Sequence, residues 1–142
     1  MRVLGVDMGE RRIGLAISDE SRLIASPLEV LSVKPHEDPL GVLVKKAEEL
    51  GVTQVVVGMP LSLRGEAGPA AERMGRIIEA LRERTDVPVA ICDERLTSVV
   101  AARSMQEAGL TERDRRGRVD SVAAALILQT WLDRRRGEGD GR

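Results

Sequence analysis

Short apolar runs follow one another closely at the start of the chain, and their spacing predicts three strands before any helix. Residues 2–8 (RVLGVDM) form a dense apolar run, residues 13–19 (IGLAISD) alternate between apolar and polar, and residues 22–33 form a third strand-like segment. Pro27 marks a bend or an edge position in the third segment. The links between the three segments are short, which favours an antiparallel meander.

After the meander, strand-like and helix-like patterns alternate. We predict a helix over residues 38–50 that ends at Gly51, a strand over 54–58, a helix over 69–84 with Pro69 in its first turn, a strand over 87–94, a helix from Thr97 or Ser98 to Gly109, and a last helix over 119–133. A basic loop over residues 110–118 would join the last two helices.

This order of elements predicts the class of fold. A meander followed by alternating strands and helices gives an α/β protein with a mixed five-stranded sheet, helices on both faces and the first strand in a central position. That is a ribonuclease H-like arrangement. We place a single domain over residues 1–136 and expect residues 137–142 to form a disordered tail.

The composition is that of an ordinary globular domain, with 42% apolar and 32% charged residues. The sequence has no apolar run long enough to span a membrane and no segment typical of a signal peptide, so we expect a cytoplasmic protein without a membrane partner. Cys92 is the one cysteine, which excludes an internal disulfide, and its apolar strand predicts a place in the core.

Positive charge is clustered, although the formal net charge is only −1. The clusters are Arg11 and Arg12, then Arg113, Arg115, Arg116 and Arg118, and finally Arg134, Arg135 and Arg136. Such clusters can bind phosphate locally, although each could equally be a solvated surface of mixed charge. Trp131 is the only aromatic residue, which excludes a platform that stacks bases, so a nucleic acid would be recognised by its backbone and shape.

An aspartate interrupts the first apolar run and is the first candidate for chemistry. Asp7 lies at the carboxyl end of the strand, where ligands bind in open α/β sheets. A carboxylate buried there without a partner would be costly, and a metal ion removes that cost. The alternative is a turn in which Asp7 accepts a hydrogen bond from the backbone of Gly9.

Two adjacent acidic residues end the last predicted strand. Side chains alternate along a strand, so only one of Asp93 and Glu94 can readily face the same site as Asp7. The sequence leaves open which of the two it is. The other one could cap the following helix.

A further aspartate opens the last predicted helix. Asp120 could be the N-cap of that helix. It also shares a helical face with the apolar residues Ala124, Ile127 and Trp131, which should pack on the sheet. An inward-pointing Asp120 at the end of this apolar stripe suits a metal site better than a solvated cap.

Carboxylates from separate regions that meet at one end of a sheet favour a hard cation, Mg²⁺ or Mn²⁺, because these ions prefer oxygen ligands. The sequence has no Cys or His pairs for a zinc site. Two hard cations about 4 Å apart can activate water and stabilise the leaving oxygen in phosphodiester hydrolysis. The one histidine, His36, lies in an unrelated loop, so the metal ions themselves would have to generate the nucleophile.

Glycine-rich stretches flank the candidate site. Gly9 and Gly14 bracket the turn between the first two strands, and the loop GMPLSLRGEAGP begins at Gly58. The amides of that loop, the N-terminus of the next helix and Arg64 could hold a phosphate, although turn chemistry alone also explains such glycines. A D-x-G turn also contacts ATP phosphates in actin-like and sugar-kinase folds, but those proteins need two such domains and this chain supplies one.

Four strings carry a resemblance to a known family, namely GVDMGERRIGLAISD, VVVGMPLSLRGEAGPAA, DERLTSVVA and VDSVAAALILQ. In this order and spacing they resemble the YqgF/RuvX family of bacterial pre-16S rRNA nucleases, also described as Holliday-junction resolvase-like proteins, from residue 2 to about residue 133. The resemblance implies a ribonuclease H-like fold and a metal-dependent nuclease. It makes Asp7, Glu94 and Asp120 the catalytic metal ligands, with Asp93 as the substitute for Glu94.

The basic clusters and the family motifs together give the candidate contacts to nucleic acid. These are Gly9, Arg11, Arg12, Gly58, Arg64, Arg95, Arg116 and Arg118. Glu10 departs from the family pattern, in which a small or basic residue is more common, and an extra acid there could weaken contact with phosphate.

The same metal chemistry serves two substrates. The first hypothesis is a nuclease that trims the 5′ end of the precursor of 16S rRNA, and the second is an endonuclease that resolves four-way DNA junctions. A resolvase must cut two strands symmetrically, which favours a homodimer, but the sequence leaves open whether this protein is a monomer or a homodimer. A third hypothesis, a nucleic-acid-binding module without catalysis, is disfavoured by the retained carboxylates.

Overall fold

The structure is a computed structural model that describes residues 1–9, 11–59, 68–94 and 112–139, with the side chains of the last segment described over residues 120–136. Its elements are, in chain order, β1 (Val3–Met8), β2 (Arg12–Ser18), β3 (Ala25–Ser32), α1 (Pro39–Leu50), β4 (Gln54–Met59), α2 (Pro69–Arg84), β5 (Val89–Asp93) and α4 (Glu112–Gly139). The helix predicted from Thr97 or Ser98 to Gly109 lies outside the described residues.

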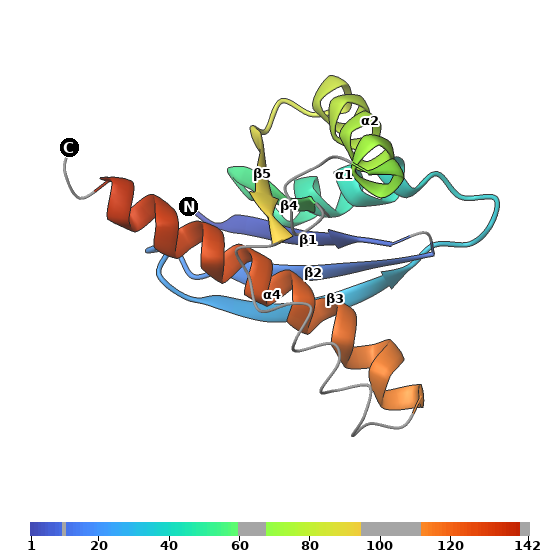
Figure 1. Cartoon of the computed structure of the whole chain (residues 1–142), viewed down its shortest axis with the longest axis horizontal. Helices are drawn as coiled ribbons and strands as arrows, with labels where there is room; N and C mark the ends of the chain where they lie inside the picture. The colour runs from blue at the N-terminus through green and yellow to red at the C-terminus, as the bar shows by residue number, and fades with distance from the viewer. Residues whose placement is uncertain (10, 60–67, 95–111, 140–142) are drawn as a thin grey trace.

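One five-stranded mixed sheet forms the middle of the molecule (Figure 1). Its strand order is β3-β2-β1-β4-β5, so β1 is central, as predicted. The first three strands form the predicted antiparallel meander, whereas β4 runs parallel to β1 and β5 runs parallel to β4. Because β1, β4 and β5 are parallel, their carboxyl ends lie at one edge of the sheet. Asp7 and Asp93 both lie at that edge.

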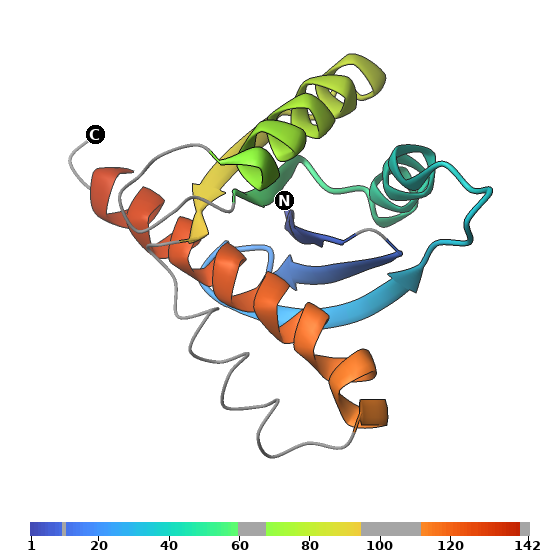
Figure 2. The same ribbon diagram turned by 45° about the vertical axis from the view of Figure 1, so that its right-hand side comes forward.

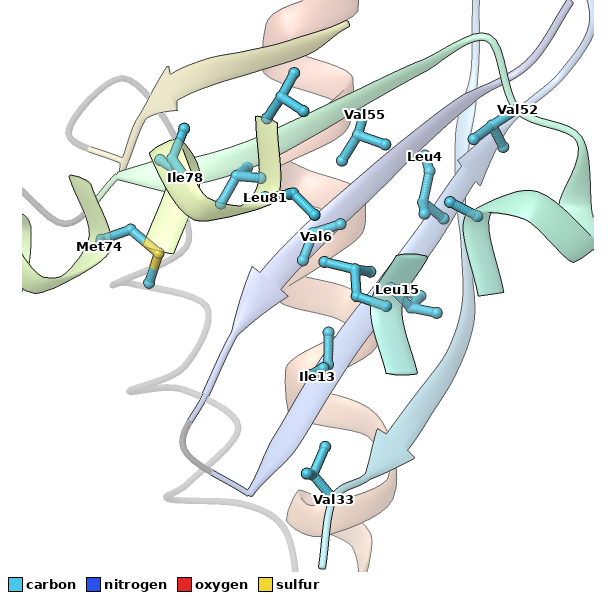
Figure 3. Packing of buried hydrophobic residues seen from close by; sticks show 14 residues of the cluster. Leu4, Val6, Ile13, Leu15, Val33, Val52, Val55, Met74, Ile78 and Leu81 are labelled. Atoms are coloured by element: carbon cyan, nitrogen blue, oxygen red, sulfur yellow. The ribbon is translucent and has the colours of Figure 1, made fainter. Parts of the chain in front are cut away.

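Helices cover both faces of the sheet, as predicted (Figure 2). On one face α1 and α2 pack on a core that includes Leu4, Val6 and Ile13 (Figure 3). On the other face α4 packs on a second core. The buried members of this second core are Val3, Ala16, Val56, Cys92, Ala123, Ala124, Ile127, Leu128 and Leu132.

The second core holds the cysteine that the sequence placed in an apolar strand. Cys92 is buried, as predicted. Burial raises the pKa of its thiol to about 11, so the thiol stays protonated at neutral pH and serves as a small apolar side chain. Within the described part of the chain, no helix is both long enough and apolar enough to cross a bilayer.

Helix α4 is longer than the sequence predicted. It begins at Glu112 and runs to Gly139, so the prediction of a basic loop over residues 110–118 is wrong from Glu112 onward, and residues 137–139 of the expected tail continue the helix. Arginine is a good helix former, and a single glycine such as Gly117 costs only about 1 kcal/mol in a helix. Clustered charge was therefore no evidence for a loop. Because α4 begins at Glu112, Asp120 lies inside the helix and is not its N-cap.

Two features fix α4 on the sheet. Gly5 lets α4 lie close to β1, because a Cβ at this position would lie 2.7 Å from the Cβ of Leu128. The next residue, Gln129, accepts a hydrogen bond from the backbone N–H of Ala25 (2.8 Å) and donates one to the backbone oxygen of Leu23 (2.9 Å). Both partners belong to the segment that leads into β3, so Gln129 sets the position of α4 along the sheet.

Replacing Gln129 with Ala should lower the free energy of unfolding by about 1–2 kcal/mol, because both hydrogen bonds to the β3 segment are lost. Urea denaturation measures this change. Gln129→Glu is the comparison variant: it keeps the acceptor for Ala25, but it loses the donor to Leu23 and to Asp133 and places a second negative charge beside Asp133, so it should also be less stable than wild type. An Ala variant as stable as wild type would show that the link contributes nothing.

Candidate active site

The first candidate ligand lies on the face of the sheet that α4 covers. Side chains alternate along β1, and Val3 and Gly5 both face α4, so Asp7 belongs to the same face. Asp7 is half-buried near the carboxyl end of the strand. Across the antiparallel ladder it stands opposite Gly14 of β2.

Asp120 reaches this place because α4 lies directly on Gly14. A Cβ built at Gly14 would lie 2.0 Å from the backbone oxygen of Asp120 and 2.9 Å from its Cβ. The missing side chain of Gly14 therefore lets the backbone of α4 touch the strand opposite Asp7. The side chain of Asp120 is half-buried there, as the inward-pointing alternative predicted.

The structure distinguishes between the two adjacent acids at the end of β5. Gly58 of β4 faces α4, and a Cβ there would lie 2.6 Å from the Cδ1 of Ile127 and 3.2 Å from the Oε1 of Glu94. Glu94 therefore lies on the α4 face. Asp93 follows Cys92, whose side chain is in the core beneath α4, so strand alternation directs Asp93 to the opposite face.

The three candidate ligands thus come from three separate parts of the chain to one face and one end of the sheet. β1 and β4 are paired in parallel up to Val6 and Val57, so the next residues, Asp7 and Gly58, are neighbours at the strand ends. Glu94 packs on Gly58, and Asp120 packs on the residue opposite Asp7. This gathering was predicted, whereas the use of these carboxylates as metal ligands stays a prediction.

An ion pair joins β2 to α4 at this place. Arg12 Nε lies 3.5 Å from Asp120 Oδ2, and the two side chains are 44% and 24% exposed. Arg12 shares its face of β2 with Gly14, two residues along the strand. The sequence marked Arg12 as a phosphate contact and did not reveal this pairing, because nothing in the sequence places α4 against β2.

The donor atoms suit a hard divalent cation, because all three side chains offer carboxylate oxygens on one half-buried face. Their positions do not yet surround one point. Among the described residues, no three acidic, His or Cys side chains lie close enough together to hold a metal ion. The chemistry of the set therefore fits Mg²⁺ or Mn²⁺, and binding would require the carboxylates to draw closer than they are here.

The structure describes some of the candidate contacts to nucleic acid in full and others only in part or not at all. Arg11 is exposed, and the backbone N–H of Gly9 donates to the backbone oxygen of Arg12 across the turn (2.9 Å). Gly58 is buried, and its visible role is to make room for Ile127 and Glu94. Arg64, Arg95 and Glu10 lie outside the described residues, and of Arg116 and Arg118 the structure shows only their place in α4.

Comparison with known proteins identifies the family to which this chain belongs. Residues 1–134 match the family described as "RuvX: Holliday junction resolvase". The chain belongs to the RuvX family. A RuvX relative from Chloroflexus aurantiacus is 45% identical over 134 residues, which cover 94% of this chain and 88% of the relative. Another from Roseiflexus sp. is 42% identical over 135 residues, which cover 95% and 96%. Both are named "Putative pre-16S rRNA nuclease".

Solved structures place the RuvX chain among resolvases by fold. The RuvC of T. thermophilus in complex with a Holliday junction substrate has a TM-score of 0.60 at 21% identity, with 96% of each chain covered. The fowlpox virus Holliday junction resolvase has a TM-score of 0.55 at 11% identity, with 94% of this chain and 99% of that chain covered. The predicted family, ribonuclease H-like fold and nuclease class are confirmed by these matches together.

Proposed function

We propose that this RuvX-family protein is a cytoplasmic, divalent-metal-dependent nuclease that processes the 5′ end of the precursor of 16S rRNA. The observation that supports it most directly is the gathering of Asp7, Glu94 and Asp120 on one face at the carboxyl edge of the sheet. Ligands bind at this edge in open α/β sheets. Phosphodiester hydrolysis of this kind needs divalent cations, and carboxylates gathered at such an edge can hold them.

The candidate residues would have different roles in the proposed reaction. Asp7, Glu94 and Asp120 would hold Mg²⁺ or Mn²⁺, which supplies the activation of water and the stabilisation of the leaving oxygen. Arg11 is exposed beside the site and suits a contact to the phosphate backbone. The lone aromatic residue, Trp131, lies on α4 with Arg135 stacked over its ring at 5.1 Å, so base stacking is not the basis of recognition.

The choice of RNA follows from the relatives. The proteins that share 42–45% identity with nearly the whole chain carry the name of a pre-16S rRNA nuclease. The protein seen with a Holliday junction is only 21% identical. A four-way DNA junction is the second candidate, favoured by the family description and by this likeness of fold. A monomer suffices for the first substrate, and a homodimer would be needed for symmetric cuts in the second.

A cleavage assay with matched substrates tests the proposal. The protein should shorten the 5′ end of a precursor 16S rRNA fragment in the presence of Mg²⁺ or Mn²⁺ and should stop when a chelator is added. A fragment that already has the mature 5′ end and a mobile four-way DNA junction serve as alternative substrates. Asp7→Asn, which changes one oxygen of the side chain to nitrogen, is the control for contaminating nucleases and should cut none of them.

The outcomes separate the hypotheses. Cleavage of the junction in preference to the precursor would replace RNA processing with junction resolution. Equal cutting by wild type and Asp7→Asn would refute the metal site. Tight binding of the precursor without cleavage under any metal condition would favour the binding module.

A further inference from the structure

An arginine on the face of the candidate site pairs with one of its three carboxylates. Arg12 Nε lies 3.5 Å from Asp120 Oδ2, which connects the start of β2 to α4. The pair forms where Gly14 lets α4 touch the sheet. It therefore lies at the point where Asp120 enters the site, not on a remote surface.

The surroundings of Asp120 favour a positively charged neighbour. Because α4 begins at Glu112, Asp120 lies inside the helix, beyond reach of the unbonded amides and positive dipole of a helix N-terminus. Asp7 and Glu94 add negative charge on the same face. The Arg12 guanidinium stays charged at any working pH, so it can offset this charge when no metal is bound.

We propose that Arg12 is a positioning residue that holds the Asp120 carboxylate in the metal-free protein and competes with the divalent cation for it. The proposal rests on the proposed function in one respect, since it needs Asp120 to be a metal ligand. The guanidinium lies beside Oδ2 and its positive charge weakens the attraction of this carboxylate for a cation, so the two partners compete for it. In this structure Oδ2 of Asp120 lies on the side of Arg12, and no three ligands converge on one point among the described residues.

The expected effect on cation binding depends on the strength of the Arg12–Asp120 ion pair. Both side chains are partly exposed, at 44% and 24%, and such pairs are weak because solvent and salt screen them. A weak pair can orient the carboxylate and still release it when a divalent cation binds. Removal of Arg12 should therefore tighten cation binding by a modest factor, which is the opposite of what loss of a ligand would do.

Calorimetric titration with Mn²⁺ alone tests the proposal on the full chain. Arg12→Ala should bind Mn²⁺ about two- to five-fold more tightly than wild type, because the competitor is gone. Arg12→Lys restores a positive charge and should return the affinity toward that of wild type. Arg11→Ala removes the same charge from the neighbouring position outside the pair, and it should leave Mn²⁺ affinity within about a factor of two. Unfolding midpoints in chelator confirm that the variants are folded.

The possible results distinguish this inference from the function on which it rests. Equal or weaker Mn²⁺ binding by Arg12→Ala, with wild type binding normally, would overturn the competition between Arg12 and the cation and leave the metal site intact. Tighter binding by both Arg12→Ala and Arg11→Ala to the same extent would also overturn it, because general charge and not the pair would be responsible. Failure of wild type to bind Mn²⁺ would refute the metal-dependent function itself. The competition between Arg12 and the cation would then be refuted as well.

Discussion

Replacing Glu94 with Gln should slow phosphodiester cleavage about 100-fold or more, whereas Asp93→Asn should leave the rate within about threefold of wild type. Glu94 packs on Gly58 on the α4 face, beside Asp7 at the neighbouring strand end. Strand alternation after the buried Cys92 directs Asp93 to the other face of the sheet. Loss of a carboxylate that holds a cation removes several kcal/mol of stabilisation from the transition state, while loss of a nearby charge on the far face changes only a screened potential.

These two variants form a matched pair. The residues are adjacent, each change is isosteric, and each removes one negative charge, so side-chain position is the main difference between them. Single-turnover cleavage of the precursor RNA measures the rates, and Mn²⁺ titration checks that only Glu94→Gln weakens cation binding. Equal losses in both variants would show that charge alone matters. A larger loss in Asp93→Asn would assign the ligand role to Asp93 and contradict the placement of Glu94.

Local sequence patterns were sufficient to predict those elements whose structure depends on neighbouring residues in the chain. The apolar alternation of residues 13–19 and the dense run QVVVG over 54–58 correspond closely to β2 and β4. Gly51 ends α1 in the left-handed conformation, with φ of 65°, and Asp38 caps its start by accepting a hydrogen bond from Leu40. Such signals act within a few residues, so they can be recognised without knowledge of the fold.

The sequence pointed to the candidate residues but not to their contacts. Asp7 was recognisable because an aspartate at the carboxyl end of a buried strand is unusual. The choice between Asp93 and Glu94 depends on which face of β5 meets α4, and that is a property of tertiary packing. The residue that distinguishes them is Gly58, whose missing side chain leaves room for Glu94.

The pairing of Arg12 with Asp120 shows the same limit. The two residues are far apart in the sequence, and their contact requires α4 to cross β2 at Gly14. The start predicted for α4 is also wrong, because a segment rich in arginine does not by itself indicate a loop. With the helix beginning at Glu112, Asp120 changes from a candidate N-cap to a residue inside the helix that pairs with Arg12. A local error in one boundary therefore altered the interpretation of a functional side chain.

Gly14→Ala should lower the free energy of unfolding by at least about 3 kcal/mol and abolish cleavage, although it adds only one methyl group. The new Cβ would lie 2.0 Å from the backbone oxygen of Asp120. A backbone cannot turn aside as a flexible side chain can, so α4 must move off β2 or β2 must bend. Either movement displaces Asp120 from the face that it shares with Asp7, so stability and activity should fall together.

Gly75→Ala is the matched control, because a Cβ built at Gly75 would meet nothing within 4 Å. Gly75 lies in the interior of α2, where alanine is the better helix former, so this variant should be as stable as wild type or more stable by up to about 1 kcal/mol. Urea denaturation in chelator compares the two variants without any contribution from bound metal. If Gly14→Ala proves as stable and as active as Gly75→Ala, the close approach of α4 to β2 is wrong. The placement of Asp120 opposite Asp7 would then need revision, because it depends on that approach.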